Sequence, residues 1–389
     1  MRRSPLAFWC YRPCMRDNHR TQTILIVSNG HGEDAVGNAL AREMLAQGAV
    51  VTAYPLVGLG HAYRGVPLLD PRQAMPSGGF SLRGSLLQVV ADLRASGWGL
   101  WREQVRMLRR HRGRYQRIIA IGDVYCLWMA AKAGEPATFI ATAKSEHNEP
   151  HRWFERRLMR RTASTTYTRD PLTAQVLASH GVNARYVGNP LMDTIDGKAE
   201  HVRDPNRPTI TLLPGSRADA PKNLALLLRL CTEVGQTKQV NIICALAPTI
   251  DQNTIGEAAR QVGWLERDGI LERKPLHVSV TGAFGAAVKA ADVIVGLAGT
   301  ANEQAAGLGK PVVAFPVAGA QYTAKFMRLQ HRLLGDALVP AADWQEAVSV
   351  VLRLLDDPAE RARRGQIGQE RMGEPGAVRH IADALLNRA

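Results

Sequence analysis

The chain has 389 residues, of which 46% are hydrophobic and 22% charged, and its formal net charge is +14. This composition is typical of a globular protein with two or three domains, and it excludes a disordered or collagen-like chain. No apolar run approaches the ~20 residues that span a bilayer, and the five scattered cysteines exclude a disulfide framework.

The positive charge is concentrated in the N-terminal half of the chain. Residues 1–20, 102–117 and 152–161 together carry a net charge equal to that of the whole chain. Such an excess indicates an anionic partner on that half. The first of these segments is expected to be a disordered basic tail, or an extension ahead of Met15 as the natural first residue.

Short apolar runs alternate with amphipathic stretches along the first half of the chain. The expected strands are residues 23–28, 50–56, 117–121, 138–142, 165–168 and 185–188. The expected helices are residues 34–47, 85–112, 124–133, 151–161 and 171–180. This alternation predicts βαβ units around a parallel sheet.

A polar, proline-containing stretch at residues 195–208 breaks both periodicities and is the expected linker. We therefore expect an α/β fold of two Rossmann-like, doubly wound domains facing each other across a cleft. The N-terminal domain is assigned to residues 21–200 and the C-terminal domain to residues 201–389. The last helix of the C-terminal domain could pack back on the N-terminal domain. The strands expected after the linker are residues 209–213, 240–246, 276–280, 293–295 and 312–315.

Residues 28–34 (Ser-Asn-Gly-His-Gly-Glu-Asp) follow the first expected strand. Their glycines fit G-x-G-x-x-A, a weak dinucleotide fingerprint, but no acidic residue ends the next strand, which argues against NAD. His31 is a candidate general base, although a single histidine in a loop is more often structural or solvated. The residues expected to face the acceptor or the sugar are Asn29, Gly30, Gly32, Glu33 and Asp34.

Asp123 follows the buried strand expected at residues 117–121. At the carboxyl end of a parallel strand its carboxylate points into the cleft, where it could take the proton of an attacking hydroxyl. The alternative role is the N-cap of the next helix, a position that aspartate often fills. Position alone does not separate the two roles.

Residues 213–217 (Leu-Pro-Gly-Ser-Arg) lie between a buried strand and an expected helix. Gly215 lets the backbone approach a ligand, Ser216 offers a hydroxyl, and Arg217 offers a planar, charged fork that suits phosphate. The helix N-terminus adds unpaired N–H groups and partial positive charge. The motif predicts a diphosphate cradle, and the alternative is a tight turn with a solvated arginine.

Residues 296–303 (Gly-Leu-Ala-Gly-Thr-Ala-Asn-Glu) follow another buried strand and open a helix. Thr300 and Glu303 have the spacing of a capping box, which needs no ligand. The functional alternative places the Glu303 carboxylate on the two vicinal hydroxyls of a ribose, and the backbone amides of Gly299 and Thr300 on phosphate. The two alternatives are compatible.

Together these motifs resemble the lipid-A-disaccharide synthase family, and in particular its divergent related branch. The matching segments are residues 187–193 (Val-Gly-Asn-Pro-Leu-Met-Asp), 213–217, 299–303 and 309–313, in family order within residues 23–340. The resemblance implies a two-Rossmann-domain (GT-B) glycosyltransferase that takes its donor on the C-terminal domain and its acceptor on the N-terminal domain. It implies donor-site roles for Gly215, Ser216, Arg217, Gly299, Thr300, Asn302 and Glu303.

The expected activity is transfer of an N-acetylglucosamine-type sugar from a UDP-sugar to a lipid-linked or glycolipid acceptor, in lipid A biosynthesis and cell-envelope lipid metabolism. Asp123 matches the family's proposed catalytic acidic position, with His31 as the alternative base, and no metal or other cofactor is expected. Asn189 stands where better-known members carry histidine. Residues 28–34 and 144–149 also depart from the family pattern, which leaves the acceptor and the donor sugar open.

The two internal basic segments lie beside tryptophans and leucines. Such a mixture suits an amphipathic element on an anionic membrane, and the alternative is a core helix with a solvated basic face. A lipid acceptor favours the membrane, so we expect a cytoplasmic protein bound peripherally to the inner face of the cytoplasmic membrane. The residues expected to face this surface are Arg102, Arg106, Arg109, Arg110, Arg156, Arg157 and Arg160.

Other functions share some of these features. A nucleotide-sugar epimerase would use the same fold and donor cradle, and a non-catalytic sugar-nucleotide or anion-binding protein would bind without turnover. Nucleic-acid binding is not expected, because no such motif occurs and only 6% of residues are aromatic. The oligomeric state is left open.

Overall fold

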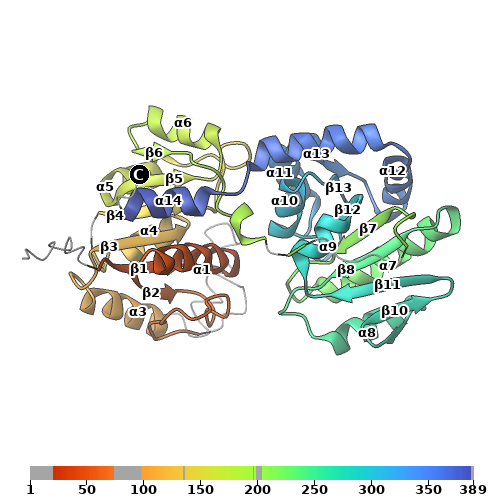
Figure 1. Cartoon of the computed structure of the whole chain (residues 1–389), viewed down its shortest axis with the longest axis horizontal. Helices are drawn as coiled ribbons and strands as arrows, with labels where there is room; N and C mark the ends of the chain where they lie inside the picture. Colours follow the sequence, from red (N-terminus) through yellow and green to blue (C-terminus); the bar gives the residue numbers. More distant parts are fainter. Residues whose placement is uncertain (1–20, 74–97, 135, 196, 199–203, 387–389) are drawn as a thin grey trace, which may run out of the picture.

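The computed structural model describes residues 21–73, 98–134, 136–195, 197–198 and 204–386. Two α/β domains lie side by side, each built around its own sheet (Figure 1). The predicted basic tail, the first part of the predicted helix 85–112 and part of the predicted linker lie outside the described residues.

In the first domain, the six strands that the structure describes run parallel in the order β2-β1-β3-β4-β5-β6. β1 lies inside the sheet, and its last five residues are fully buried because both faces are covered. The strands are β1 (Thr23–Ser28), β2 (Val50–Pro55), β3 (Arg117–Gly122), β4 (Ala137–Ala141), β5 (Ala163–Thr168) and β6 (Ala184–Arg185).

Helices of the first domain begin where the strands end, as βαβ units require. α1 buries Val36, Leu40 and Met44, which are spaced to share one face. α6 begins at a proline that follows its N-cap, Asp170, whose carboxylate accepts the backbone N–H of Thr173 at 2.7 Å. The helices are α1 (His31–Ala46), α3 (Trp98–Arg110), α4 (Val124–Ala130), α5 (Trp153–Thr162) and α6 (Pro171–Ser179).

In the second domain, the eight described strands form a sheet in the order β14-β13-β12-β7-β8-β11-β10-β9. The sheet is parallel except at one edge, where β9, β10 and β11 pair antiparallel. β9, β10 and β14 are absent from the sequence-based expectations, because they are three or four residues long and lack a strand periodicity. The strands are β7 (Thr209–Leu213), β8 (Asn241–Ala245), β9 (Leu265–Arg267), β10 (Ile270–Arg273), β11 (Leu276–Thr281), β12 (Val293–Gly296), β13 (Val312–Ala314) and β14 (Leu338–Pro340).

The helices of the second domain cover both faces of this sheet and continue toward the C-terminus (Figure 1). α7 is the longest of those described, with 18 residues, and it buries a leucine-rich face. The helices are α7 (Ala220–Thr237), α8 (Gln252–Arg260), α9 (Phe284–Ala290), α10 (Thr300–Gly307), α11 (Ala324–Leu334), α12 (Trp344–Asp356) and α13 (Pro358–Met372).

The last helix, α14 (Ala377–Leu386), crosses back and lies against α1 of the first domain (Figure 1). Gln47 Nε2 donates a 2.8 Å hydrogen bond to Asp383 Oδ1 across this contact. The crossing is held by Asp193, whose carboxylate accepts the backbone N–H groups of Gly376 and Val378. The segment 187–193 therefore ties the two passages of the chain between the domains together.

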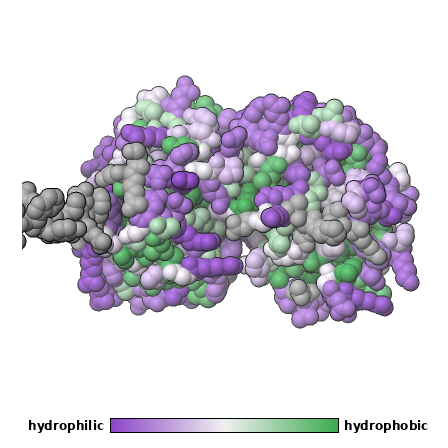
Figure 2. Space-filling model, viewed as in Figure 1, coloured by the Kyte–Doolittle hydropathy of each residue, from purple (hydrophilic) through white to green (hydrophobic). Residues whose placement is uncertain are grey.

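The expected α/β fold class, with two doubly wound sheets, is confirmed. The boundary at residue 200 stays a prediction. No helix of the described residues is long and apolar enough to cross a membrane. Seen from the same side as in Figure 1, the space-filling view shows mostly hydrophilic residues at the outer margins of both domains, and the outline is indented between the domains (Figure 2).

Candidate functional site

The strand order of the first domain reverses beside β1. The chain proceeds from β1 to β2 on one side and then returns to β3 on the other, and ligands of doubly wound sheets bind at such a switch point. The loops after β1 and β3 meet there, because Asn29 Nδ2 donates a 2.7 Å hydrogen bond to Asp123 Oδ1. A Cβ atom at Gly122, where φ is 138°, would collide with the Asn29 side chain. The structure thus brings two of the predicted motifs together.

Asp123 fills one of the two roles that its position suggested, and its role as a general base stays a prediction. It is the N-cap of α4, and its Oδ1 atom accepts the backbone N–H of Cys126 at 3.0 Å. It is also half-buried at the switch point. Burial is the main cause that raises the pKa of Tyr125, and the neighbouring Cys126 and then the Asp123 charge add to it. This phenol therefore stays protonated beside the carboxylate.

The remaining residues of the loop at 28–34 divide between surface and interior. His31 is exposed as the first residue of α1, and Glu33 is half-buried in the first turn. Asp34 is buried and does not face the acceptor side as predicted, because its Oδ1 accepts a 2.6 Å hydrogen bond from Ser28 Oγ. Burial raises the pKa of Asp34 to about 7, against the lowering effect of the Ser28 hydrogen bond.

The second domain has its own switch point, between β7 and β12. The chain builds β7, β8 and β11 toward one edge and then returns to β12 beside β7. Two more predicted motifs, residues 213–217 and 296–303, leave the carboxyl ends of these two strands. They approach closely, since a Cβ atom at Gly215, where φ is 102°, would lie 3.4 Å from the backbone oxygen of Leu297.

Arg217 is exposed at this edge, and its Nη1 atom donates to Oε1 of Gln321. Asp219 is the N-cap of α7 by position but does not cap it with its side chain. Its Oδ2 atom instead accepts the backbone N–H of Gln321 at 2.8 Å. Lys222, in the first turn of α7, reaches the same loop through a 2.5 Å hydrogen bond to the oxygen of Ala318. The loop after β13 and Lys222 were not predicted, since no motif marks them.

The segment at 296–303 differs from the capping box that its spacing predicted. Gly299 is the N-cap of α10 and makes no side-chain cap, while Thr300 is already the first helical residue. Asn302, predicted at the donor, is fully buried instead, and donates 3.0 Å hydrogen bonds to Gly296 O and Gln330 Oε1. These hydrogen bonds of Asn302 stabilise the turn between β12 and α10, because the first turn of α10 directs the Asn302 side chain into the domain.

Glu303 faces the first domain. Its Oε2 atom lies 2.6 Å from Nη2 of Arg169, a residue 134 positions earlier in the chain. Arg169 follows β5, and its Nη1 atom donates to the backbone oxygen of Thr142 at 3.2 Å. Sequence reasoning missed Arg169, because one arginine after a strand forms no motif. Its only signal was its place at the carboxyl end of a parallel strand.

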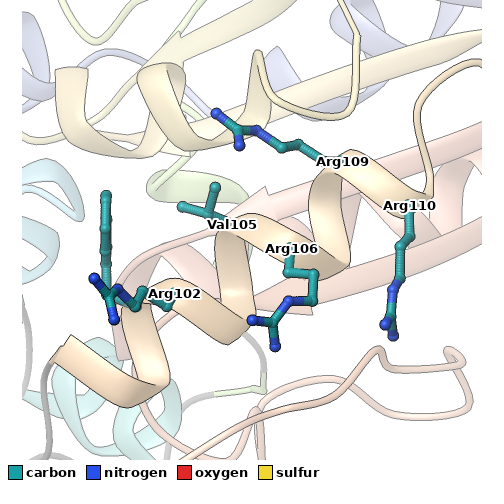
Figure 3. Close-up of a pocket in the computed structure, with 6 residues that line it drawn as sticks. Arg102, Val105, Arg106, Arg109 and Arg110 are labelled. Carbon is teal, nitrogen blue, oxygen red and sulfur yellow. The ribbon is translucent and has the colours of Figure 1, made fainter.

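The arginines of α3 named as membrane-facing are all exposed. The helix buries Leu100, Val105 and Leu108 and exposes its arginines, as both a membrane-bound helix and a core helix with a solvated basic face would. Arg106 and Arg110 extend to the same side of the helix, and Arg109 to the opposite side (Figure 3). An open hollow of about 560 Å³ lies along this helix. Its lining residues are Trp101, Arg102, Val105, Arg106, Arg109 and Arg110.

The predicted basic residues of α5 lie on a helix that is separated from α3 by one other helix. α4 lies between α3 and α5 and contacts both. Arg157 and Arg160 are exposed, and Arg156 is half-buried with its Nη1 atom 3.0 Å from His180 Nε2. Trp153 beside them is 70% exposed. Contact with a membrane stays a prediction for both helices.

The chain is 24% identical over 373 residues to the lipid-A-disaccharide synthase of Solibacter usitatus (strain Ellin6076), covering 84% of this chain and 94% of the relative. It is 29% identical over 217 residues to the synthase of Pseudomonas aeruginosa (strain UCBPP-PA14), covering 49% of this chain and 54% of the relative. No family model matches. The resemblance to this family that the motifs indicated is confirmed.

Solved structures with the same fold are more distant in sequence. The calicheamicin glycosyltransferase CalG4 matches with a TM-score of 0.61 at 17% identity, over 95% of this chain and 99% of that chain. UDP-GlcNAc 2-epimerase from Neisseria meningitidis, bound to UDP-GlcNAc, matches with a TM-score of 0.56 at 13% identity, over 94% and 100%. MurG from Acinetobacter baumannii matches with a TM-score of 0.55 at 11% identity, over 95% and 100%. These likenesses establish the GT-B fold.

Proposed function

We propose that this chain is a glycosyltransferase that moves an N-acetylglucosamine-type sugar from a UDP-sugar to a lipid-linked acceptor at the inner face of the cytoplasmic membrane. Similarity to lipid-A-disaccharide synthases supports the reaction class. The observation that carries the proposal is the pair of switch points, one on each domain. One switch point carries a loop of the kind that binds diphosphate and the other carries a carboxylate, and the Arg169–Glu303 ion pair joins the two domains.

The donor is assigned to the second domain. Gly215 permits close approach of the backbone to the diphosphate, and the charged Arg217 guanidinium contacts the neutral side-chain amide of Gln321. The N-terminus of α7 adds N–H groups that the Asp219 side chain leaves uncapped. Glu303 is assigned to the ribose hydroxyls. Positive charge at this edge stabilises the UDP leaving group as its bond to the sugar breaks.

The acceptor is assigned to the first domain. Its attacking hydroxyl transfers a proton to Asp123 as the new bond forms at the anomeric carbon and the bond to UDP breaks, through an oxocarbenium-like transition state. Asn29 holds the carboxylate in place through its 2.7 Å hydrogen bond. His31, exposed on the same loop, is the alternative base. The transfer releases UDP and leaves the sugar on the acceptor oxygen.

The membrane is assigned to the face that carries α3 and α5. The exposed arginines of these helices give this face a positive charge, and Trp153 and Phe154 add exposed aromatic surface at the start of α5. A basic residue near an anionic bilayer contributes about 1 kcal/mol, so several together suffice for peripheral attachment. A lipid-linked acceptor would then be delivered to the domain that holds Asp123.

A UDP-release assay tests this proposal. The protein is incubated with UDP-N-acetylglucosamine, with and without a bacterial membrane lipid extract, and the sugar nucleotide is followed by NMR. Release of UDP that depends on the lipid supports a transferase. Conversion of the sugar nucleotide to its epimer without lipid would identify an epimerase instead, and binding with neither reaction would identify a non-catalytic sugar-nucleotide protein.

A further inference from the structure

Arg169 and Glu303 form an ion pair between the two domains. Nη2 of Arg169 lies 2.6 Å from Oε2 of Glu303, which is within the range of a charge-assisted hydrogen bond. The side chains are 8% and 15% exposed, respectively, so the pair is shielded from most of the solvent. The two residues come from the carboxyl end of β5 and from the first turn of α10. Their contact therefore depends on how the two domains approach each other.

The surroundings of Arg169 hold its guanidinium rigidly. Its Nη1 atom donates to the backbone oxygen of Thr142, which follows β4. Burial alone would lower the pKa of Arg169, but nearby negative charges, with the charge and hydrogen bond of Glu303 foremost among them, together outweigh this effect, and the pKa lies above its ordinary value. The negative charges of Asp170 and Glu33 act in the same direction. The guanidinium is thus a fixed cation that the first domain presents to α10.

Glu303 has more acceptor capacity than this pair uses. An ionised carboxylate offers about four lone-pair positions on two oxygens, and Arg169 engages only Oε2. With one oxygen fixed, the side chain loses rotational freedom before any ligand arrives. A carboxylate that is already oriented binds vicinal hydroxyls without a further loss of rotamer entropy.

We infer that Arg169 is a positioning residue for the donor nucleotide: from the first domain it holds Glu303 of the second domain and orients it toward the ribose hydroxyls. The inference rests on the proposed function, because that proposal assigns the ribose to Glu303. The domain that receives the acceptor then also sets the affinity for the donor. Separation of the domains releases Glu303 and weakens its hold on the ribose, so ribose recognition is coupled to domain closure.

The test compares binding of UDP and 2′-deoxy-UDP by isothermal titration calorimetry. The wild type should bind UDP about tenfold or more tightly than 2′-deoxy-UDP, because a charge-assisted hydrogen bond to a hydroxyl is lost with the analogue. Arg169→Gln should lower this ratio toward one while changing the affinity for 2′-deoxy-UDP little. Arg169→Lys should restore part of the ratio. A thermal unfolding curve verifies that each variant is folded.

Further variants separate positioning from a general structural effect. Glu303→Gln should lower the ratio as Arg169→Gln does, and the double variant should lower it no further, since both act through one carboxylate. Arg363→Gln removes an exposed arginine from its pair with Glu360 on α13 and should leave the ratio unchanged. Arg169→Gln/Glu303→Gln removes both charges of the ion pair together, so it leaves no buried carboxylate without its partner.

The outcomes distinguish the inference from the proposed function. If Arg169→Gln keeps the wild-type ratio, or weakens both nucleotides equally, the positioning role is wrong while the donor site stands. If the wild type binds UDP no better than 2′-deoxy-UDP, Glu303 does not contact the ribose and the inference is overturned. If the wild type binds no UDP at all, the proposed function itself fails, and the inference with it.

Discussion

Asn29 Nδ2 donates a 2.7 Å hydrogen bond to Oδ1 of Asp123, and this bond joins the loops that follow β1 and β3. The same oxygen accepts the backbone N–H of Cys126 at the start of α4. Two donors on one oxygen fix the orientation of the carboxylate. The carboxylate is thus already oriented before an acceptor arrives.

Replacing Asp123 with asparagine should slow transfer while preserving donor binding. Removal of a general base costs typically 10²–10⁴-fold in turnover, so we expect a loss in kcat of about that size. Asparagine fills an N-cap as well as aspartate does, and α4 should therefore remain folded. The measurement is the initial rate of lipid-dependent UDP release, together with UDP affinity.

The matched variant for this experiment is His31→Gln, at the exposed first residue of α1. It should keep nearly all activity. A variant pattern in which Asp123→Asn is fully active and His31→Gln is not would transfer the role of base to the histidine.

Arg217→Ala should weaken UDP binding. A hydrogen bond to a charged group contributes about 1.5–3 kcal/mol, which corresponds to roughly tenfold to hundredfold in affinity. Arg267→Ala removes an exposed arginine on the edge strand β9 and serves as the control in the same calorimetric titration. Unchanged UDP affinity in Arg217→Ala would remove this loop from the donor site.

Neutralising two arginines of α3 should weaken binding to anionic membranes. Arg106 and Arg110 extend to the same side of the helix (Figure 3), and each contributes about 1 kcal/mol near such a surface. Arg106→Gln/Arg110→Gln should therefore reduce partitioning onto phosphatidylglycerol vesicles by about thirtyfold. The measurement is a sedimentation assay at low ionic strength.

The control pair for the vesicle assay is Arg267→Gln/Arg332→Gln, which removes the same charge from exposed positions of the second domain. It should bind vesicles nearly as the wild type does. If both double variants lose vesicle binding equally, the net charge of the protein, and not the arginines of α3, determines the affinity for the vesicles.

Asp34 should make the stability depend on pH. Burial raises its pKa from 3.8 to about 7 in the folded protein, although the Ser28 hydrogen bond lowers it. The folded state therefore holds this proton more tightly than the unfolded chain, and the resulting stabilisation, complete below about pH 4, is lost as the pH rises toward about 7. Asp34→Asn cannot ionise, so its free energy of unfolding should rise relative to the wild type across this range by a few kcal/mol, on the order of 1.4 kcal/mol per pKa unit.

Urea unfolding at several pH values measures this difference. Asp70→Asn, which replaces a carboxylate with 69% side-chain exposure, should show no comparable trend. If the difference in the free energy of unfolding between Asp34→Asn and the wild type does not change with pH, the pKa of Asp34 is not raised by folding.

Much of the fold follows from local patterns. Strands such as β1 and β7 are continuous apolar runs that end in glycine, proline or polar residues, and their predicted bounds match the structure. β6 is shorter than predicted, with two residues, because most of its predicted range lies in the segment that leads to the domain crossing. The hairpin of β9 and β10 has exposed residues on a mixed edge, so it carries no alternating signal.

The site was predictable at the level of loops but not of side-chain directions. The four motifs leave strand ends that the topology brings to two switch points. Which side chain faces the cleft depends on where each helix begins: α10 begins at Thr300, so Asn302 turns inward and Glu303 outward. Arg169 meets Glu303 only through the packing of the two domains, and no local pattern contains that information.

The measurement that tests the central claim most directly is mass spectrometry of lipids after incubation of the protein with UDP-N-acetylglucosamine and native membrane lipids. The account predicts a lipid whose mass increases by one N-acetylhexosamine, formed in equal amount with released UDP and lost in Asp123→Asn. An unchanged lipid profile in the presence of bound UDP-sugar, across extracts that contain sugar-bearing lipids, would contradict it.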